Sequence, residues 1–559
     1  MKQVYRHTGT LGWLWKAIAK SRLGIAGLLM IQMVLNGCVV VYALLFRDLV
    51  DRAIAGDRDG FFLSVGALVG MTAFQILLRA CFRTLDEHTK AVAENSLKHR
   101  LFRTLLGRDY AAVTAVHTGE WMNRLTSDTT VVSNGVTQIL PHLGGLVVRL
   151  VGAVAAIVLL EPTFGFLLVP GGLAVIGVTR LLRPWLKKMH IRIQESDGSL
   201  RVLLQERLDN LLITRAYSQQ EAAAEQAAQR MDIHKDARMK RIAVSNIANV
   251  GFGAAINGLY LIGAFVCGNG ILEGTLTFGT MTAVLELVSQ LRAPLSGISG
   301  YLSQWHGMIA SAERLMEPEG CRSDDAVADT AACLAYYQQE FSNLRVENLC
   351  FAYETEDRQV VMKDLNLQVR KGEFVALAGH SGCGKSTLLK LLLCLYRPDS
   401  GEIFLEGKDE TRPLTPADRG LFAYVPQGNQ LMSGTIRQIL TFYREAEAED
   451  EDRLWNALEV ACARDFVEEL THGLDTELGE HGAGLSEGQL QRLAVARAIF
   501  SRRPILLLDE STSALDEATE KRLLDNLRTM TDRTVLVVTH RPRAMEICHR
   551  VLRLDGDTE

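Results

Sequence analysis

Long apolar stretches recur along the first three hundred residues of the chain. A helix of about 20 apolar residues is long enough to cross the hydrocarbon core of a membrane. Windows of this length and character lie near residues 24–46, 61–82, 138–160, 163–182, 244–270 and 278–300. The pattern therefore predicts an all-α membrane domain with six transmembrane helices, in contact with the lipid bilayer.

The connections between these windows differ sharply in length. Residues 83–137 and 183–243 are long enough for helices to continue well beyond the membrane, whereas the segments 47–60, 161–162 and 271–277 are short. Lys and Arg gather in the two long connections and in the N-terminal segment. Because cytoplasmic loops carry the excess of these residues, both termini and both long connections are expected in the cytoplasm.

A different pattern begins after Asn343. Short runs rich in β-branched residues alternate there with helical ones, which is typical of an α/β domain. The charge follows the same division, since the first part of the chain is basic and the last part is acidic. We therefore predict an interfacial helix over residues 1–22, the six-helix domain over 23–317, a linker over 318–342 and an α/β domain over 343–559.

A few polar residues lie within the apolar windows and are candidates for the lining of a cavity in the membrane domain. Arg149 lies in the third window, and an arginine at the centre of a membrane helix costs about 2.5 to 3.5 kcal/mol on insertion scales. Glu286 and Gln290 lie four residues apart in the sixth window, and Asn257 ends a stripe of small and amide residues in the fifth. These residues either line a substrate cavity or join helices to one another. Spacing leaves both alternatives open, with the cavity favoured for Arg149 and Glu286.

The segment 373–393, EFVALAGHSGCGKSTLLKLLL, combines a strand pattern, a glycine-rich loop and a leucine-rich helix. A P-loop requires this context, because glycine lets backbone N–H groups approach phosphates and the helix N-terminus favours their charge. Lys385 is expected to reach the β and γ phosphates, and Ser386 to ligate Mg²⁺. The residues expected around the nucleotide are Gly379, Ser381, Gly382, Cys383, Gly384, Lys385, Ser386 and Thr387. The segment predicts ATP and Mg²⁺ as cofactors.

Residues 505–510 form an apolar run that ends in two carboxylates. Asp509 is expected to hold Mg²⁺ through water, and Glu510 to orient or deprotonate the attacking water. An apolar run ending in Asp-Glu is, on its own, weak evidence for a nucleotide site. It becomes specific here because it follows a phosphate loop and precedes residues 511–516, STSALD.

Residues 485–489, LSEGQ, followed by Gln-Arg at 491–492 and Ala-Arg-Ala at 496–498, resemble the signature motif of ATP-binding cassette (ABC) proteins. Residues 476–482 and 117–128 resemble two further segments typical of exporters in that family, and the resemblance covers essentially the whole chain. It implies the exporter-type fold, an all-α six-helix transmembrane domain followed by an α/β P-loop NTPase domain.

The resemblance implies further residue roles at the nucleotide. Tyr353 would stack on adenine, and Gln427 would contribute to sensing magnesium and the membrane domain. His540 would contact the γ-phosphate, so that Glu510, His540 and Lys385 form the catalytic set.

The signature motif implies a second subunit. Ser486, Gly488 and Gln489 would complete the nucleotide site of that partner, with Asp516 at the dimer seam. A homodimer with two working sites is the simplest arrangement, and a heterodimer with a degenerate partner is the alternative.

Three residues depart from the family pattern. Glu487 stands where glycine is usual, which we expect to tune nucleotide affinity. His481 stands where arginine is usual, which either weakens coupling between the two domains, makes it depend on pH, or has no effect. Cys383 lies in the phosphate loop beside a helix N-terminus, where thiolate character is favoured. The ten cysteines contain no CxxC pair, so the sequence indicates neither a zinc site nor a disulfide framework.

The expected function is export of an amphipathic peptide, lipid or drug, driven by ATP hydrolysis. Import by the same fold, and an ATPase that gates a conductance or serves a regulatory complex, remain alternatives. The predicted spans exclude a soluble ABC ATPase that acts on nucleic acid, and the expected location is a bacterial plasma membrane with the ATPase domain in the cytoplasm.

Overall fold

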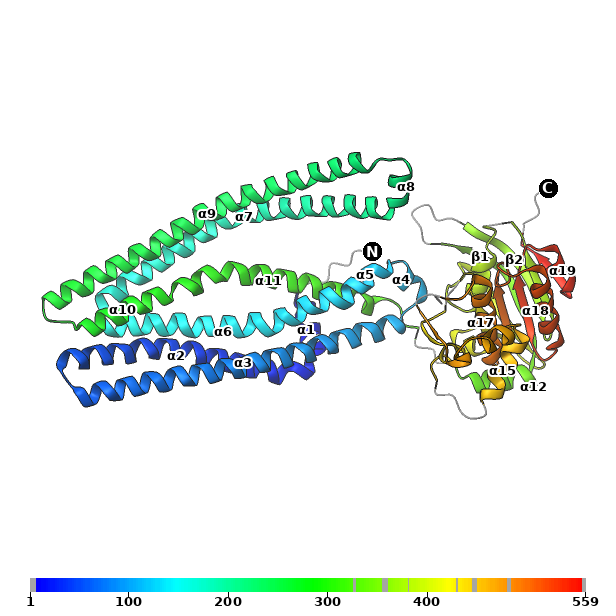
Figure 1. The fold of residues 1–559 in the computed structure, drawn as a ribbon, viewed down its shortest axis with the longest axis horizontal. Coiled ribbons are helices and arrows are strands. Elements are labelled where there is room, and N and C mark those ends of the chain that lie inside the picture. The colour runs from blue at the N-terminus through cyan, green and yellow to red at the C-terminus, as the bar shows by residue number, and fades with distance from the viewer. Residues whose placement is uncertain are drawn as a thin grey trace. The chain divides into compact units, whose positions relative to one another are not determined.

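The computed structural model describes the chain apart from residues 1–6, 325–327, 354–359, 381, 429–430, 445–449, 480–483 and 555–559. The chain forms two compact units (Figure 1). The helical unit contains Met1–Arg103 and Gly119–Glu317, and the α/β unit contains Thr104–Thr118 and Pro318–Glu559. The α/β unit therefore includes a short segment from the middle of the predicted membrane domain.

Long helices account for all six predicted apolar windows. They are α2 (Arg22–Ala55), α3 (Arg58–Leu106), α6 (Thr129–Leu160), α7 (Pro162–Asp209), α9 (Gln220–Leu272), α10 (Phe278–Gln290) and α11 (Arg292–Met316). The sixth window is divided between α10 and α11, and α3, α7 and α9 extend far past their windows, as predicted for the long connections. At the N-terminus, α1 (His7–Ala17) and the 3₁₀ turn η1 (Ala19–Ser21) replace the single predicted helix.

Four helical stretches of the described residues are long and apolar enough to cross a membrane. By length and composition, the helices of the described chain that are suited to crossing a membrane are Ala19–Ala55, Arg58–Leu106, Thr118–Leu160 and Gly253–Leu272. The N-terminal half of the chain is thus built largely from apolar helices of spanning length.

Close helix packing organises the helical unit. α2 packs along α6, and α7 packs along α9 (Figure 1). Gly145 of α6 permits the first contact, because a Cβ there would lie 3.0 Å from the carbonyl oxygen of Gln32 on α2. Small residues at helix contacts serve this purpose in membranes.

A buried ion-pair network joins the start of α6 to α11. Residues 117–128, which resemble a coupling loop, form α5 (Thr118–Asn123) and a π-helical turn η2 (Arg124–Asp128). Asp128 accepts hydrogen bonds from Arg314 Nε at 2.8 Å, Arg314 Nη2 at 2.6 Å and Ser311 Oγ at 2.9 Å. Because the Asp128 side chain is 3% exposed, loss of Arg314 would leave a buried charge without its counter-ion.

Two sheets form the framework of the α/β unit. A parallel sheet has the order β11 (Arg550–Arg553), β3 (Phe374–Ala378), β10 (Thr534–Val538), β9 (Ile505–Asp509) and β6 (Phe422–Val425). An antiparallel sheet has the order β2 (Val360–Arg370), β1 (Phe341–Ala352), β4 (Ser400–Gly407) and β5 (Thr411–Pro413), and β7 (Gly434–Thr435) pairs with β8 (Glu477–Leu478). Every residue of β3, β9 and β10 is buried, which is typical of a parallel sheet covered on both faces.

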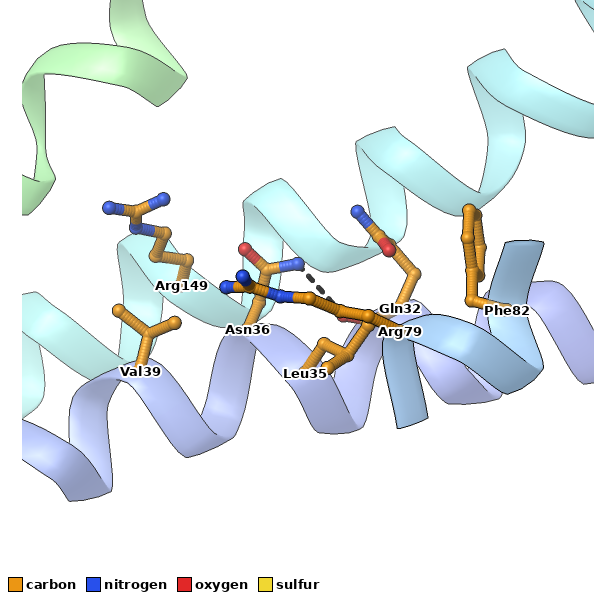
Figure 2. A pocket seen from close by; sticks show the side chains of 7 residues that line it. All are labelled: Gln32, Leu35, Asn36, Val39, Arg79, Phe82 and Arg149. Atoms are coloured by element: carbon orange, nitrogen blue, oxygen red, sulfur yellow. Dashed lines mark hydrogen bonds between the residues drawn. The ribbon is translucent and has the colours of Figure 1, made fainter. Parts of the chain in front are cut away.

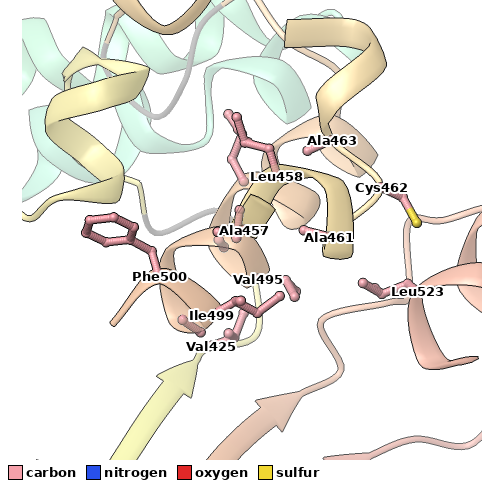
Figure 3. Packing of buried hydrophobic residues seen from close by; sticks show 14 of the residues in the cluster. Val425, Ala457, Leu458, Ala461, Cys462, Ala463, Val495, Ile499, Phe500 and Leu523 are labelled. Atoms are coloured by element: carbon pink, nitrogen blue, oxygen red, sulfur yellow. The ribbon is translucent and has the colours of Figure 1, made fainter. Parts of the chain in front are cut away.

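The helices that follow the phosphate loop in this unit are α13 (Lys385–Leu392), α14 (Ile436–Leu440), α15 (Asp450–Val460), α16 (Arg464–Glu468), α17 (Glu487–Phe500), α18 (Glu517–Thr529) and α19 (Pro542–Ile547). Of these, α13 contacts β9 and α17 contacts β6, whereas α14 and α15 contact α17. Figure 3 shows part of the largest apolar core, in which Val425 of β6, Leu458 of α15 and Ile499 of α17 belong to one cluster. This core fixes the sheet that carries the candidate site.

The linker predicted over 318–342 is largely a folded part of the α/β unit, which corrects that expectation. Its alanine-rich stretch forms α12 (Thr330–Gln339), capped by Asp329, whose side chain accepts hydrogen bonds from two backbone N–H groups. Cys333 and Tyr337, four residues apart on one face, are buried, and the Tyr337 hydroxyl lies 2.8 Å from Thr534 Oγ1. The polar, alanine-rich composition concealed this short helix.

The segment 104–118 is the second difference from the predicted boundaries. It contains the short helix α4 (Tyr110–Thr114) and belongs to the α/β unit. The Asp109 N–H donates to the Arg322 carbonyl at 3.0 Å, and the Asp324 N–H donates to the Gly107 carbonyl at 2.9 Å. These backbone bonds join two segments that are far apart in the sequence.

Candidate functional site

The phosphate loop follows β3 and leads into α13. Gly382 and Gly384 have φ values of 88° and 98°, which L side chains adopt only with strain. A Cβ at Gly384 would also lie 2.8 Å from Val361 Cγ1. Glycine at these positions is therefore required by the shape of the loop, while Ser381 lies outside the residues that the structure describes.

Lys385 is buried at the first position of α13. Its Nζ donates to the carbonyl oxygens of Gly379 at 2.9 Å and His380 at 2.8 Å. The ammonium group is thus held over the loop by the backbone, where an incoming phosphate would meet it. Cys383 Sγ lies 3.7 Å from the same Nζ.

The carboxylate at the end of β9 meets the first turn of α13. Ser386 Oγ donates to Asp509 Oδ1 at 2.9 Å, and the Tyr424 hydroxyl donates to Asp509 Oδ2 at 3.2 Å. Burial raises the pKa of the Asp509 carboxyl, although these two hydrogen bonds act in the opposite direction. Burial and the Asp509 charge also raise the pKa of Tyr424, which keeps its hydroxyl a donor.

The oxygen set fits Mg²⁺ better than a metal held by the protein alone. Mg²⁺ usually keeps several waters and binds one or two protein oxygens together with substrate phosphates. Ser386 Oγ and Asp509 Oδ1 supply two such oxygens side by side, and no cluster of three or more His, Cys, Asp or Glu suited to a metal lies among the described residues. The metal would therefore arrive with the nucleotide.

Glu510 lies directly after β9, beside Gln427. Gln427 Nε2 donates to Glu510 Oε2 at 2.6 Å. Glu510 has a φ of 48°, and a left-handed conformation of this kind costs a non-glycine residue about 1 to 3 kcal/mol. The backbone thus turns sharply at the residue predicted to act on the attacking water.

The parallel sheet brings the predicted catalytic residues to one edge. Ligands bind at the carboxyl ends of strands in such sheets. Gly379 follows β3, His540 follows β10, Glu510 follows β9 and Gln427 follows β6, and these four strands are consecutive neighbours. His540 is exposed at this edge, as a group that contacts a ligand requires.

Tyr353 contacts other residues of its own domain. Its hydroxyl lies 2.9 Å from Thr387 Oγ1, and its ring meets Tyr396 edge-on with centroids 5.4 Å apart. The structure thus places Tyr353 against the phosphate-loop helix.

The signature segment begins α17. Ser486 caps the helix, and its N–H donates in turn to Gln489 Oε1 at 2.8 Å. A Cβ at Gly488 would lie 2.9 Å from the Ala514 carbonyl oxygen, and Gln491 Nε2 donates to Ser513 Oγ at 3.1 Å. The start of α17 therefore packs tightly against the segment that follows Glu510.

Two of the remaining predicted positions are exposed in this chain. Glu487 lies in the first turn of α17, where a negative charge is favoured by the helix dipole. Asp516 caps α18 through the N–H groups of Thr519 at 3.0 Å and Ala518 at 3.1 Å, which lower its pKa. His481 lies outside the described residues.

Arg541 and Tyr424 were missed by sequence reasoning. Arg541 donates to the carbonyl oxygens of Ser513 at 2.7 Å and Leu515 at 3.0 Å, and to Glu520 Oε2 at 2.7 Å. It thus fixes the segment between Glu510 and α18. No motif in the sequence marks either residue, although Arg541 directly follows His540.

A polar cavity of about 220 Å³ lies within the helical unit (Figure 2). Its lining residues come from α2, α3 and α6 and are Gln32, Leu35, Asn36, Val39, Arg79, Phe82 and Arg149. In Figure 2, the Arg79 side chain extends toward Asn36, and Arg149 projects from α6 near Val39. Asn36 Nδ2 donates to the Gln32 carbonyl at 2.8 Å. Among the described residues, neither arginine has a carboxylate within 4.0 Å.

Of the four predicted cavity residues, Arg149 lines this space, and the other three do not. Gln290 is buried and donates to Glu286 Oε1 at 3.2 Å and to the Val39 carbonyl at 3.4 Å, which joins α10 to α2. Asn257 and Glu286 are exposed. The spacing of Glu286 and Gln290 reflects a contact within α10, and Arg79 was overlooked although it too is a charge within an apolar window.

Comparisons with known proteins match both units. A family model described as ABC transporter matches residues 362–513, and one described as ABC transporter transmembrane region matches residues 25–295. The first range contains the phosphate loop, the signature segment and Glu510. It excludes Tyr353, Asp516 and His540, whose roles rest on the sequence resemblance and on their positions in the fold.

Individual relatives cover the chain to different extents. It is 30% identical over 453 residues to ABC transporter B family member 1 of Dictyostelium discoideum, covering 80% of this chain and 48% of that protein, so it spans about half the length of that relative. It is 27% identical to the ATP-dependent lipid A-core flippase of Aliivibrio fischeri, covering 97% of this chain and 92% of the flippase. A solved bacterial Atm1-family ABC exporter with ATP bound has a TM-score of 0.78 at 22% identity, covering 96% of this chain and 93% of the exporter.

Proposed function

The chain belongs to the ABC transporter family, and from this premise we propose that it hydrolyses ATP as a dimer to export an amphipathic anion. The observation that carries the proposal is the convergence of Gly379, Gln427, Glu510 and His540 at the carboxyl edge of consecutive parallel strands. As an integral multi-pass membrane protein of this family, it would have its ATPase unit in the cytoplasm, and we propose a bacterial plasma membrane.

Residues already paired within the site would exchange partners when the nucleotide binds. Lys385 would turn from the loop carbonyls to the phosphates, and Ser386 and Asp509 would hold the metal. Bound Mg-ATP supplies the phosphoanhydride bond and a cation that neutralises charge on its phosphates. Glu510, oriented by Gln427, would hold and deprotonate the attacking water.

A second copy of the chain is the partner we propose. The exposed start of α17 would complete the partner's nucleotide site, with Ser486, Gly488 and Gln489 facing its phosphates and Asp516 at the seam. The turn between α7 and α9 supports a partner as well. It contains α8 (Leu211–Ala216), and Leu212 and Tyr217 there are 82% and 74% exposed, which is apolar surface that a second chain would cover.

The cavity between α2, α3 and α6 supports a cargo with an anionic group. Arg79 and Arg149 offer planar guanidinium groups that match phosphate or carboxylate, while Leu35, Val39 and Phe82 offer apolar contact. An arginine in a membrane helix is costly. Glu286 acts on Arg149 only at a distance beyond ion-pair contact, so an anion bound in the cavity would reduce that cost. The relative that transports lipid A is consistent with a lipid-like cargo.

Transport into sealed vesicles tests this function. Full-length protein would be reconstituted with its α/β unit outside, and amphiphiles with the same tail and anionic, zwitterionic or cationic headgroups would be added with Mg-ATP. We expect ATP-dependent accumulation of the anionic amphiphile inside, and none with Glu510→Gln. ATP hydrolysis without accumulation would overturn export in favour of a gating ATPase, movement in the opposite direction would indicate import, and accumulation of only the cationic amphiphile would refute the proposed cargo.

A further inference from the structure

One face of α3 leads from the cavity to a carboxylate. Arg79 and Phe82 line the cavity (Figure 2), and Asp86 follows Phe82 by four residues. Residues spaced by three, four and seven positions lie on the same face of a helix. Seven residues of helix rise about 10.5 Å, so Asp86 lies about two turns from Arg79, toward the end of α3 at Leu106. The face that carries a cation inside the cavity thus carries an anion beside it.

Asp86 has no counter-ion in contact within the described chain. Lys90 and His142 interact with Asp86 electrostatically, but neither comes within 4.0 Å of its carboxylate as an ion pair among the described residues. The Oδ1 atom of Asp86 is buried and has no hydrogen-bond partner there. An unpaired buried oxygen is costly, so a hydrogen-bond donor brought by a ligand would stabilise it.

Thr137 of α6 adds a second unpaired oxygen beside this carboxylate. Its side chain lies close enough to Asp86 to interact with it, and Thr137 is 0% exposed. Thr137 Oγ1 has no hydrogen-bond partner in the described part of the chain, and the same holds for the buried Oδ1 of Asn134, one turn earlier on the same face of α6. Because buried polar atoms are nearly always paired in folded proteins, these oxygens indicate a place for a ligand that donates hydrogen bonds.

His142 lies between this place and the cavity. Its ring meets the ring of Phe82 edge-on with centroids 6.1 Å apart, and the ring of Tyr301 on α11 with centroids 5.9 Å apart. Its Nδ1 lies 2.7 Å from the Gln138 carbonyl oxygen, and since a carbonyl only accepts, Nδ1 donates there. The neutral ring therefore has Nε2 as an acceptor and offers Asp86 no donor. The neighbouring aromatic rings favour a cationic group nearby.

We propose that the anionic headgroup of the cargo also carries an ammonium group, and that Asp86 and Thr137 bind this ammonium. The proposal rests on the proposed function, since it requires that Arg79 and Arg149 hold the anionic group. The headgroup would lie along α3, with its anion in the cavity and its cation about two turns away. An ammonium group has three N–H donors and no acceptor, which suits a set of unpaired oxygens. Asp86 is thus a specificity-determining residue for the cargo.

Binding of two matched series of amphiphiles tests the proposal, with the full-length protein in lipid nanodiscs and without nucleotide. Every member has the same alkyl tail and a phosphodiester. The first series carries a primary amine on spacers of increasing length, and in the second series this amine is acetylated, which keeps the length but removes the charge. We expect the amine to bind about tenfold more tightly than its acetylated counterpart, as for a charge-assisted hydrogen bond. An optimum at an intermediate spacer length would show that one molecule reaches both groups.

Four variants assign the difference to its residue. Asp86→Asn keeps the size of the side chain and removes its charge, so the two series should bind to it equally. Glu87→Gln is the matched control, because it removes the exposed carboxylate of the next residue and should leave the difference intact. Arg79→Gln should weaken both series to the same extent, since it acts on the phosphodiester. Thr137→Val should reduce the difference about threefold, as for loss of a neutral hydrogen bond.

The outcomes separate this proposal from the function on which it rests. Equal and tight binding of both series by the wild type would overturn the ammonium site alone. A difference that persists in Asp86→Asn, or that is lost equally in Glu87→Gln, would also overturn it. If Asp86→Asn does not fold, Thr137→Val and the spacer series in the wild type still decide the point. If phosphodiesters bound no better than neutral amphiphiles with the same tail, the anionic cargo of the proposed function would be wrong instead.

Discussion

Polar groups are satisfied in different ways in the nucleotide site and in the membrane cavity. In the α/β unit, Lys385 donates to loop carbonyls, Ser386 to Asp509 and Gln427 to Glu510. In the cavity, Arg79 and Arg149 have no ion pair among the described residues, and Arg149 Nε is buried without a hydrogen-bond partner there. The first site is complete before its ligand binds, whereas the second is left with excess positive charge.

This difference teaches what each ligand has to contribute. A nucleotide must compete with existing hydrogen bonds, so the net gain from each new contact is modest and selectivity comes from fitting many partners at once. A cargo that brings an anionic group to the cavity meets two guanidinium groups, of which Arg149 has the carboxylate of Glu286 nearby but not in ion-pair contact. We therefore expect cargo affinity to depend on charge more steeply than nucleotide affinity depends on any single contact.

The largest expected effect comes from Glu510→Gln. Glutamine keeps an oxygen for Gln427 Nε2 but cannot take a proton from water, so turnover should fall about a thousandfold, as for loss of a general base. Phosphate release would measure turnover, and equilibrium binding of labelled ATP should be unchanged within about twofold. Glu517→Gln, an exposed change in the same unit, is the control, and substantial residual hydrolysis in Glu510→Gln would remove its assigned role.

The next largest effect is expected from neutralising the cavity. Arg79→Gln and Arg149→Gln should each weaken binding of an anionic amphiphile about tenfold, since each removes a charge-assisted hydrogen bond. Binding would be measured without nucleotide, in lipid nanodiscs. Arg83→Gln changes an arginine of α3 that does not line the cavity, and an equal loss of affinity in that variant would contradict a specific site.

Sequence reasoning could predict those parts of the candidate site that are formed by neighbouring residues. The phosphate loop, the carboxylates after β9 and the signature segment are each continuous, so their residue order alone fixes glycine φ values, caps and strand ends. Their meeting at one edge follows from the parallel sheet that such segments form.

Sequence reasoning could not predict features that depend on contacts between distant segments of the chain. Arg79 and Arg149 belong to different helices, and only the packing of α2 against α6, permitted by Gly145, creates the space between them. Gln290 seemed free to line a cavity, but it bonds the Val39 carbonyl on α2. Likewise, nothing in the composition of 318–342 showed that Cys333 and Tyr337 would be buried by an adjacent sheet.

A smaller effect is expected at Cys383, whose Sγ lies beside Lys385 Nζ. An adduct of N-ethylmaleimide at this thiol would occupy the phosphate loop, so the reagent should slow ATP turnover about tenfold. Mg-ATP should protect the enzyme, and Cys383→Ser should resist the reagent while Cys350→Ser should not. Equal inhibition of Cys383→Ser and the wild type would show that another thiol is responsible.

The smallest effect is expected at Asp418, a buried carboxylate whose hydrogen-bond donors, Arg412 and Thr415, belong to its own domain. Burial raises its pKa, but hydrogen bonds from Arg412 at 2.6 and 2.9 Å and from Thr415 outweigh it and leave the pKa lowered. Because the pKa of Asp418 is lower in the folded state than in the unfolded state, ionised Asp418 stabilises the fold above the unfolded-state pKa of about 3.9. This stabilisation is lost as the pH falls through the folded-state pKa.

Asp418→Asn should therefore reduce stability by about 1 kcal/mol at pH 7, because asparagine keeps an acceptor for Thr415 but loses its charge. Melting temperatures measured across pH should differ between variant and wild type above pH 5 and converge as the pH falls below about 4. If the difference in melting temperature between variant and wild type stayed constant down to acidic pH, the charge of Asp418 would not contribute to stability.

The chain passes between its two units after residues 103, 118 and 317, and this has a consequence for dissecting the protein. A fragment that starts at Pro318 would lack α4, so Tyr396 would lose its contact with Tyr110, and the backbone at 322–324 would lose its partners at 107–109. The ATP hydrolysis rate of such a fragment would be that of a domain in which the surface normally covered by residues 104–118 is exposed to solvent. Restoring residues 104–118 by fusion to the start of that fragment is the way to obtain an excised ATPase that behaves as it does in the whole chain.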